Sequence, residues 1–469
     1  MKVAFLTLGC KVNSYETEKM KMQFEEAGHT VVAFEEEADA YIINTCTVTN
    51  IADRKSRKML HRARRKNPDA IVVATGCYVD SSQKKGEKDE SVDLFLSNEQ
   101  KPQLVEQVVS FFQTRSMKKT TEESTEIIAD DARDDVQTTS QARAKKDAHK
   151  MMSEKALEEE HTRAYLKVQD GCNQYCTYCI IPYVRGPLTS KTTKEVLEEV
   201  KRLAAQGIQE VVVTGIHLSS YGVDFTDKKS FLELEGRPLL NLLQEIAGVE
   251  EIKRIRLGSL EPRIITENFA KELSEIPKIC PHFHLSLQSG CDNVLKRMNR
   301  HYTAADYLER LEILRKYFSN PAITTDIIVG FPQETEEDFQ VTCDFVRKAE
   351  FSQLHVFKYS RRQGTMADAM EGQIPENVKA ERSERLIAVG KEMQQQYQEA
   401  FCGQEEKVLF EEIVTIEGQE YLVGYNERYV RFGVAMQDLQ DAEKMCNTIS
   451  GVRILGHITP EIMKAECIR

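Results

Sequence analysis

Three cysteines lie within eight residues near the middle of the chain: Cys172, Cys176 and Cys179, spaced C-x3-C-x2-C. Three thiolates can hold three corners of a cubane iron–sulfur cluster and leave one iron open to a small ligand. A structural zinc ion takes four protein ligands, and no fourth Cys or His follows at short distance. The spacing therefore favours a catalytic iron–sulfur cluster over a zinc knuckle. Tyr178, directly before the third cysteine, supports this interpretation.

Three further cysteines share a position relative to predicted strands. Cys10, Cys46 and Cys77 each follow an apolar stretch, and helical stretches separate these strands. This alternation predicts a doubly wound α/β domain with a parallel sheet. The carboxyl ends of parallel strands meet at one edge, where ligands bind. The three thiols can therefore converge on a second cluster. The alternative is that they are three unrelated core cysteines.

A second series of strands and helices follows the Cys172 loop. The expected strands cover residues 164–168, 210–214, 254–257, 284–287, 325–329 and 354–359. Six strands with helices between them predict a partial parallel (β/α)6 barrel, with its chemistry at the carboxyl ends of the strands. Polar or glycine-rich motifs lie at several of those ends, and they include Gly215, Glu261 and Gln288. Each of these has a simple structural alternative, as a turn, a loop charge or a strand-end hydrogen bond. His217 and His284 are expected to be structural.

The predicted domains are residues 1–112, the barrel of residues 164–400, and residues 401–469. Short strands after Gly403 predict a small β-barrel of the oligonucleotide-binding type. Residues 113–163 have the composition of a charged, solvated linker. No apolar stretch is long enough to span a membrane, and Met1–Gly9 is expected to be a strand and not a signal peptide. Cysteine use without such a signal indicates a reducing compartment, the cytoplasm.

The net charge of −12, from 63 basic and 75 acidic residues, argues against general coating of nucleic acid. Any RNA contact must then be local. Residues 53–66 contain eight Lys or Arg and one acid, so a phosphate contact there competes with a solvated charged face. The C-terminal residues are net acidic, which leaves one strand for RNA or makes this barrel a packing domain. The RNA-binding candidates are Arg54, Arg57, Arg62, Arg65, Arg428 and Arg431, with Tyr429, Arg297, Arg300 and Arg361 as further possibilities.

The segment GCNQYCTYCIIPYVRG, residues 171–186, resembles the methylthiotransferase branch of the radical S-adenosylmethionine (SAM) enzymes. Residues 8–18 and 44–50 resemble the cluster-binding domain of the same family, and the C-terminal barrel resembles its RNA-binding TRAM domain. The resemblance implies two 4Fe–4S clusters. Cys10, Cys46 and Cys77 would hold the auxiliary cluster, and Cys172, Cys176 and Cys179 the cluster that cleaves SAM.

The resemblance also implies contacts to SAM from Tyr178, Gly215, Glu261 and Gln288. Met366 stands where relatives are expected to have proline, which puts the conformation of one loop in doubt.

The resemblance is strongest to the enzymes that act on N6-threonylcarbamoyladenosine, next to the anticodon of tRNA. It implies addition of a methylthio group to carbon 2 of that base. The expected partners are tRNA, a flavodoxin-like or ferredoxin-like electron donor and a sulfur source, and the expected state is a monomer. The alternatives are another tRNA adenosine, a ribosomal-protein aspartate, or a non-enzymatic RNA-binding protein stabilised by metal.

Overall fold

The computed structural model describes residues 1–86, 89–126, 162–225, 236–439 and 442–468. The chain divides into two compact units. Unit 1 comprises residues 1–47 and 51–161, and unit 2 comprises residues 48–50 and 162–469. Most of the predicted linker, including the helix expected near residues 141–160, lies outside the described residues. No helix in the described part of the chain is long and apolar enough to cross a membrane.

Unit 1 is built on a parallel sheet with the strand order β2-β1-β3-β4-β5. The strands are β1 Lys2–Thr7, β2 Thr30–Val32, β3 Ala40–Thr45, β4 Ile71–Gly76 and β5 Leu94–Leu96. The helices are α1 Lys11–Glu26, α2 Asn50–Lys66, α3 Cys77–Lys85 and α4 Leu104–Glu126, and the 3-10 helix η1 is Asn98–Gln103.

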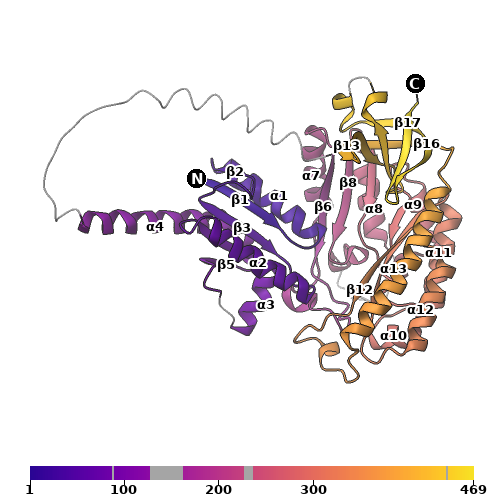
Figure 1. Ribbon diagram of the computed structural model, residues 1–469, viewed down its shortest axis with the longest axis horizontal. Helices are drawn as coiled ribbons and strands as arrows, with labels where there is room; N and C mark the ends of the chain where they lie inside the picture. The colour runs from indigo at the N-terminus through magenta and orange to yellow at the C-terminus, as the bar shows by residue number, and fades with distance from the viewer. Residues whose placement is uncertain (87–88, 127–161, 226–235, 440–441, 469) are drawn as a thin grey trace. The chain divides into compact units, whose positions relative to one another are not determined.

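Helices cover both faces of this sheet. Alternate residues of a strand point to opposite faces, so each strand contributes side chains to two cores. Val3 packs with Phe24 of α1 and Leu104 of α4 in one core, whereas Ala4 packs with Leu60 of α2 in the other. The doubly wound prediction is confirmed, and the strand order is that of flavodoxin-like folds. The ribbon of this unit is drawn in indigo to purple (Figure 1).

Unit 2 contains the predicted partial barrel of parallel strands. The strands are β6 Arg163–Asp170, β8 Glu210–Gly215, β9 Arg254–Leu257, β10 His282–His284, β11 Ala322–Val329 and β12 Gln353–Lys358. Parallel pairing joins β6 to β8 and β9, and β10 to β11 and β12. The isolated bridge between Leu260 and Leu285 links the two halves. β7 Thr189–Ser190, an antiparallel neighbour of β6, was not predicted.

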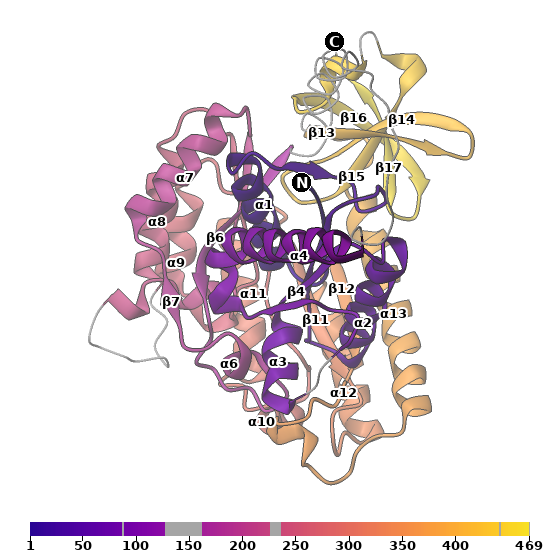
Figure 2. The ribbon, with the colours of Figure 1, turned by 90° about the vertical axis from the view of Figure 1, so that its left-hand side faces the viewer.

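Helices follow the barrel strands in sequence (Figures 1 and 2). They are α7 Thr193–Ala205, α8 Arg237–Ala247, α9 Glu267–Ser274, α10 Asp292–Arg297, α11 Ala304–Tyr317, α12 Glu336–Ala349 and α13 Glu376–Glu399. The start of α7 is fixed by the expected capping box, in which Thr192 and Glu195 each accept the backbone N–H of the other.

The C-terminal residues form a closed five-stranded barrel with the order β13-β14-β15-β17-β16. Its strands are β13 Glu405–Ile416, β14 Gln419–Tyr425, β15 Arg431–Ala435, β16 Ile449–Thr459 and β17 Ile462–Cys467. The last strand was not predicted. Tyr429, which was expected inside a strand, has a left-handed φ of 64° and belongs to the turn before β15. In this turn the Asn426 side chain accepts the N–H groups of Arg428 and Val430.

A buried ionic joint connects the two barrels of unit 2. Arg256 binds Glu210 at 2.7 Å, and both side chains are 1% exposed. Arg254 donates to the carbonyls of Lys407 and Tyr425, and Arg256 donates to that of Glu427. Burial alone would raise the pKa of Glu210, but the neighbouring guanidiniums, that of Arg256 first, lower it. The carboxylate therefore stays charged and balances the buried arginines.

Helix α13 also belongs to both parts of unit 2, as Figure 1 shows in orange beside the yellow barrel. Leu386 and Val389 pack in the core of the parallel barrel. Tyr397, near the end of the same helix, packs with Phe401 in the core of the C-terminal barrel. The connection between the barrels is thus itself part of both cores.

We expect Glu210→Gln to destabilise unit 2 strongly, because the change leaves buried guanidiniums without their carboxylate. Removing one partner of a buried pair costs about 3–5 kcal/mol. Urea unfolding followed by circular dichroism measures the change. Arg237→Gln is the matched control, since the Arg237 side chain is 54% exposed and pairs with Glu272 at the surface. Equal midpoints for Glu210→Gln and the wild type would contradict the prediction.

Candidate active site

The loop of Cys172, Cys176 and Cys179 begins where β6 ends. Gly171 has a φ of 66°, and a Cβ atom there would overlap the carbonyl of Pro187. The buried Gln169 side chain donates to the carbonyl of Gly171 at 2.7 Å. Its Oε1 atom accepts the backbone N–H of His217 at 2.7 Å. Glycine at position 171 and glutamine at position 169 therefore fix how the loop leaves the strand. No pattern in the sequence points to Gln169.

The middle of the loop is held by the segment that follows α10. The Thr177 backbone N–H donates to the carbonyl of Met298 at 3.1 Å, and its hydroxyl donates to that of Arg297 at 2.8 Å. The Asn299 side chain donates to the carbonyl of Tyr175, whose φ is 48°. These bonds hold the backbone of the loop whether or not the thiols have a ligand.

The three thiols of this loop are partly buried. Burial first, and the neighbouring Cys176 as well, raise the pKa of Cys179 to about 12. Burial likewise raises the pKa of Cys172 to about 11. Without a metal these two thiols hold their protons at neutral pH, so binding of a cluster must displace them.

Arg300, one of the further possibilities for an RNA contact, lies against this loop. Its guanidinium is 3.3 Å from the Sγ atom of Cys176 and 3.0 Å from the hydroxyl of Tyr302. The neighbouring candidates are also paired, Arg297 with Asp338 at 3.0 Å and Arg361 with Asp368 at 3.0 Å. The sequence offered no signal that Arg300 reaches the cysteine loop, because Cys176 is 124 residues away in the chain.

The predicted SAM contacts lie at the carboxyl ends of barrel strands. Gly215 ends β8, and a Cβ atom there would come within 2.7 Å of Gln169 Oε1. Glu261 is buried after β9, and its carboxylate accepts the Nε–H of Arg263 at 2.7 Å. Gln288 follows β10 with a left-handed φ of 70° and bridges to Ile327 of β11.

Tyr178, the fourth predicted contact, points to a small apolar cluster with Phe331, at a centroid distance of 6.4 Å. All four are at or near the predicted edge of the barrel, and their contacts to SAM stay predictions.

The two histidines have different surroundings. His217 Nδ1 is 2.7 Å from the Ser220 hydroxyl, and its Nε2 atom is buried without a hydrogen-bond partner among the described residues. Burial first, and then the charges of Arg300 and Arg263, lower its pKa to about 3. The imidazole is therefore neutral at neutral pH. His284 lies 3.3 Å from Asp326, which agrees with the structural role expected for it.

Unit 1 places Cys10, Cys46 and Cys77 at one edge of its sheet. They follow β1, β3 and β4, which are neighbours in the sheet, and Thr45 pairs with Gly76 just before the second and third cysteines. A Cβ atom at Gly9, whose φ is 108°, would lie 2.7 Å from the Cβ and 2.9 Å from the Sγ of Cys46. The absence of a side chain at Gly9 thus makes room for the Cys46 side chain. The ends of β1, β3 and β4 therefore lie at one edge of the sheet, as predicted.

The comparisons with known proteins cover nearly the whole chain. Residues 166–346 match the radical SAM superfamily, and residues 2–97 match an uncharacterized protein family, UPF0004. The threonylcarbamoyladenosine tRNA methylthiotransferase MtaB of Bacillus subtilis is 38% identical, over 97% of this chain and 93% of its own length. A tRNA-2-methylthio-N(6)-dimethylallyladenosine synthase of Moorella thermoacetica is 34% identical, over 87% of this chain and 86% of its own. The chain belongs to the radical SAM tRNA methylthiotransferases.

A solved structure supports the fold of such a methylthiotransferase. The radical SAM methyltransferase TsrM of Kitasatospora setae, with cobalamin and a 4Fe–4S cluster bound, aligns with a TM-score of 0.51 at 15% identity. The alignment covers 78% of this chain and 77% of that one. At this identity the likeness concerns the fold alone.

Membership of the radical SAM methylthiotransferases implies a 4Fe–4S cluster and SAM, and the donor atoms fit. Each triad offers three thiols at the carboxyl edge of a parallel sheet, and thiolates are the ligands of such clusters. In the described residues no group of three or more His, Cys, Asp or Glu side chains is placed so that it could hold a single metal ion. A cubane distributes its three thiolates over three irons, so they need not converge on one point.

The arginines predicted to bind RNA in this methylthiotransferase differ in their surroundings. On α2, Arg54 is exposed, Arg57 lies over the ring of Tyr78, and Arg62 pairs with Glu35 at 2.7 Å. Arg65, also exposed, donates to the carbonyl of its own helix at His61.

The C-terminal candidates are bound within the protein. Arg428 pairs with Glu406 at 3.4 Å and donates to the carbonyls of Ser319 and Asn320. Arg431 pairs with Glu412 at 2.7 Å. These contacts favour the alternative that the C-terminal barrel is a packing domain. RNA binding by α2 and by Arg428 and Arg431 stays a prediction.

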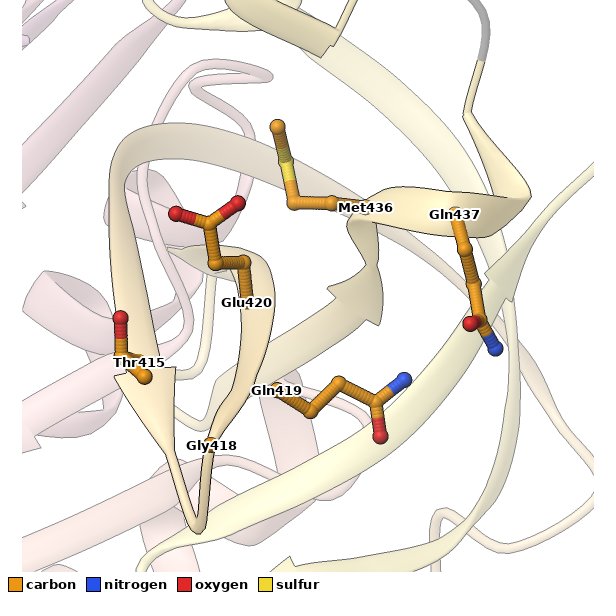
Figure 3. A pocket seen from close by; sticks show the side chains of 6 residues that line it. All are labelled: Thr415, Gly418, Gln419, Glu420, Met436 and Gln437. Atoms are coloured by element: carbon orange, nitrogen blue, oxygen red, sulfur yellow. The ribbon is translucent and has the colours of Figure 1, made fainter.

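A hollow on the C-terminal barrel lies at the β13–β14 turn (Figure 3). Its lining residues are Thr415, Gly418, Gln419, Glu420, Met436 and Gln437. One acid and no base line it, so its charge does not suit a phosphate.

We expect Gly9→Ala to remove the cluster of unit 1 and leave that of unit 2. The added methyl group would occupy the space of the Cys46 thiol. Iron content after anaerobic reconstitution should fall from about eight to about four per chain, the content of one cubane. Gly28→Ala is the control, because Gly28 also has a left-handed φ, 79°, but has no atom within 4 Å of the added position. Equal iron in Gly9→Ala and the wild type would refute the prediction.

Proposed function

We propose that this protein replaces the hydrogen on carbon 2 of N6-threonylcarbamoyladenosine in tRNA by a methylthio group. The observation that carries the proposal is the loop of Cys172, Cys176 and Cys179 at the end of β6, in a chain that matches relatives named for this substrate over almost its full length. Relatives named for dimethylallyladenosine match at lower identity and over less of this chain. That substrate is therefore the second candidate.

In this proposal each triad of thiols holds one 4Fe–4S cluster. Cys172, Cys176 and Cys179 would hold the cluster that, when bound, would supply one electron for the reductive cleavage of SAM. Residues of the chain do the positioning. Gln169, Gly171 and Thr177 hold the backbone of the loop, so that its three thiols are presented together.

The proposal extends to the partners and the domains. The electron comes from a flavodoxin-like or ferredoxin-like donor, a separate sulfur source renews the sulfur, and the protein acts as a monomer in the cytoplasm. Residues 1–112 form the auxiliary-cluster domain, 164–400 the radical SAM domain, and 401–469 a TRAM-like barrel, with the linker at 113–163. Basic residues of α2 contact the tRNA backbone.

Two exposed tyrosines give the radical SAM loop a surface for unstacked bases. Tyr175 is 52% exposed and Tyr183, on α6 Ile181–Val184, is 44% exposed. Their rings lie edge to face at a centroid distance of 6.2 Å. An adenine carbon is not accessible inside a stacked loop, so the target base must leave the stack. Aromatic side chains beside the site can stack on the bases that this exposes.

The first test is methylthiolation of tRNA by the reconstituted protein with SAM and a reductant. We expect one methylthio group per modified base, detected by mass spectrometry of nucleosides from tRNA with and without the threonylcarbamoyl group. A variant with Cys172, Cys176 and Cys179 changed to Ala should lose this activity and about four irons. Product on dimethylallyladenosine would favour the second candidate. Product on ribosomal protein, or zinc in place of iron, would refute the proposal.

We expect a variant with Tyr175 and Tyr183 both changed to Ala to bind tRNA more weakly, because stacking contributes about 1–3 kcal/mol per base. A filter-binding or fluorescence titration at fixed salt measures the dissociation constant. The matched control changes both residues to Phe, which keeps the rings and should keep the affinity. Iron content should be the same in all three proteins. Equal affinity of the Ala and Phe variants would rule out a stacking role.

A further inference from the structure

Arg300 lies beside the radical SAM loop and donates hydrogen bonds to acceptors around it. Its Nη1 atom is 3.3 Å from the Sγ of Cys176, and its Nη2 atom is 3.4 Å from the carbonyl oxygen of Ser286. Its Nε atom is 3.0 Å from the Tyr302 hydroxyl. The guanidinium thus donates to acceptors on three segments: the cluster loop, the end of β10 and its own loop.

The orientation of this guanidinium is fixed by a buried tyrosine. The Tyr302 hydroxyl donates to the carbonyls of Ser286 and Leu287 at 2.6 and 2.8 Å, so its lone pairs face Arg300. The Tyr302 ring lies 4.9 Å from the guanidinium carbon. The planar fork of arginine suits three acceptors at once, and it keeps its charge at any working pH. These contacts aim one N–H group at a thiol that would ligate iron.

The charges around Arg300 do not form a closed ion pair with it. Glu261 is the acid that influences Arg300, but its carboxylate oxygens accept from Arg263. Tyr302, Cys176 and Tyr178 also act on the charge of Arg300, as do Cys172 and Cys179 of the same loop. The positive charge of Arg300 therefore lies beside Cys176, and in the described residues no carboxylate forms an ion pair with Arg300.

We propose that Arg300 makes one-electron reduction of the radical SAM cluster more favourable, by donating a hydrogen bond to the Cys176 thiolate and placing a positive charge next to it. The inference rests on the cluster of the proposed function. The reduction adds one electron from the donor and breaks no bond, and Arg300 keeps its proton throughout. A partly buried site strengthens the interaction. Hydrogen bonds to sulfur and local charge are known determinants of cluster potentials. Arg300 is a positioning residue in this sense.

The test is a redox titration of the full chain, followed by electron paramagnetic resonance. Cys10, Cys46 and Cys77 are changed to Ala in every sample, so that the signal comes from the remaining cluster alone. In Arg300→Gln we expect the equilibrium constant for reduction to fall at least tenfold, a negative shift of about 59 mV for one electron. Arg300→Lys keeps the positive charge, so its reduction potential should lie between that of Arg300→Gln and that of the parent. The parent is the protein in which only Cys10, Cys46 and Cys77 are changed.

Arg297→Gln is the matched control. It removes only the Arg297 side chain, which pairs with Asp338 at 3.0 Å, and it keeps the backbone carbonyl that accepts the Thr177 hydroxyl, so it should leave the potential unchanged. An unchanged potential in Arg300→Gln with full iron would overturn the proposal, and so would an equal shift in Arg297→Gln. If the parent itself binds no iron, the proposed function fails together with the inference. If it binds iron and Arg300→Gln shows no shift, only the role of Arg300 fails.

A second measurement is made on the protein that retains Arg300, so its outcome does not depend on a cluster in Arg300→Gln. The protein is grown with 15N-labelled arginine, and the reduced cluster is examined by pulsed electron paramagnetic resonance. We expect a coupling to 15N from the N–H group that faces Cys176. The coupling should be absent in Arg300→Lys if that variant keeps its iron. No 15N coupling in the parent protein would overturn the proposal even if Arg300→Gln fails to hold a cluster.

Discussion

The chemistry of this protein depends on one constraint: parallel strands end at the same edge of their sheet. In unit 1, neighbouring strands β1, β3 and β4 each lead into a cysteine, so three cysteines far apart in sequence lie at the same edge of the sheet. In unit 2 the same geometry brings the Cys172 loop to the end of β6 and the polar motifs to the ends of β8, β9 and β10. Glycines at these ends let the backbone turn where a side chain would collide.

Several arginines of unit 2 bind groups within the protein and do not point freely into solvent. Arg254 and Arg256 bind the C-terminal barrel through its backbone carbonyls, and Arg428 returns the contact to the loop at Ser319 and Asn320. Arg300 reaches a cluster cysteine. In an acidic protein, these basic groups stabilise internal joints, so less of the positive charge is left for nucleic acid. This distribution explains why a count of arginines said little about where RNA binds.

Local patterns were enough to predict most of the fold. Apolar runs predicted β1, β3, β4 and five of the barrel strands, whereas the run expected at residues 284–287 shares only His284 with β10. Cysteine spacing predicts the Cys172 triad, and the positions of cysteines after strands predict the triad of unit 1. Elements without such runs were missed: β7 has two residues, and β17 alternates apolar and polar residues. Gln169 and the role of Arg300 were also missed, because a side chain that supports a loop from a distant segment leaves no periodic signal. Tyr429 was placed in a strand because its residue type favours one, but the Asn426 turn determines its conformation.

Helix α13 has a consequence for how this protein can be divided. Its middle residues pack in the parallel barrel and its end packs with Phe401 in the C-terminal barrel, while buried arginines join the same two parts. The C-terminal barrel therefore shares its packing with the parallel barrel and is not a separate domain joined by a linker. A chimera that exchanges this barrel between relatives would have to include the end of α13 together with the carbonyls that bind the arginines. The suitable junction therefore lies inside α13 and not at the end of this helix, where the barrel begins.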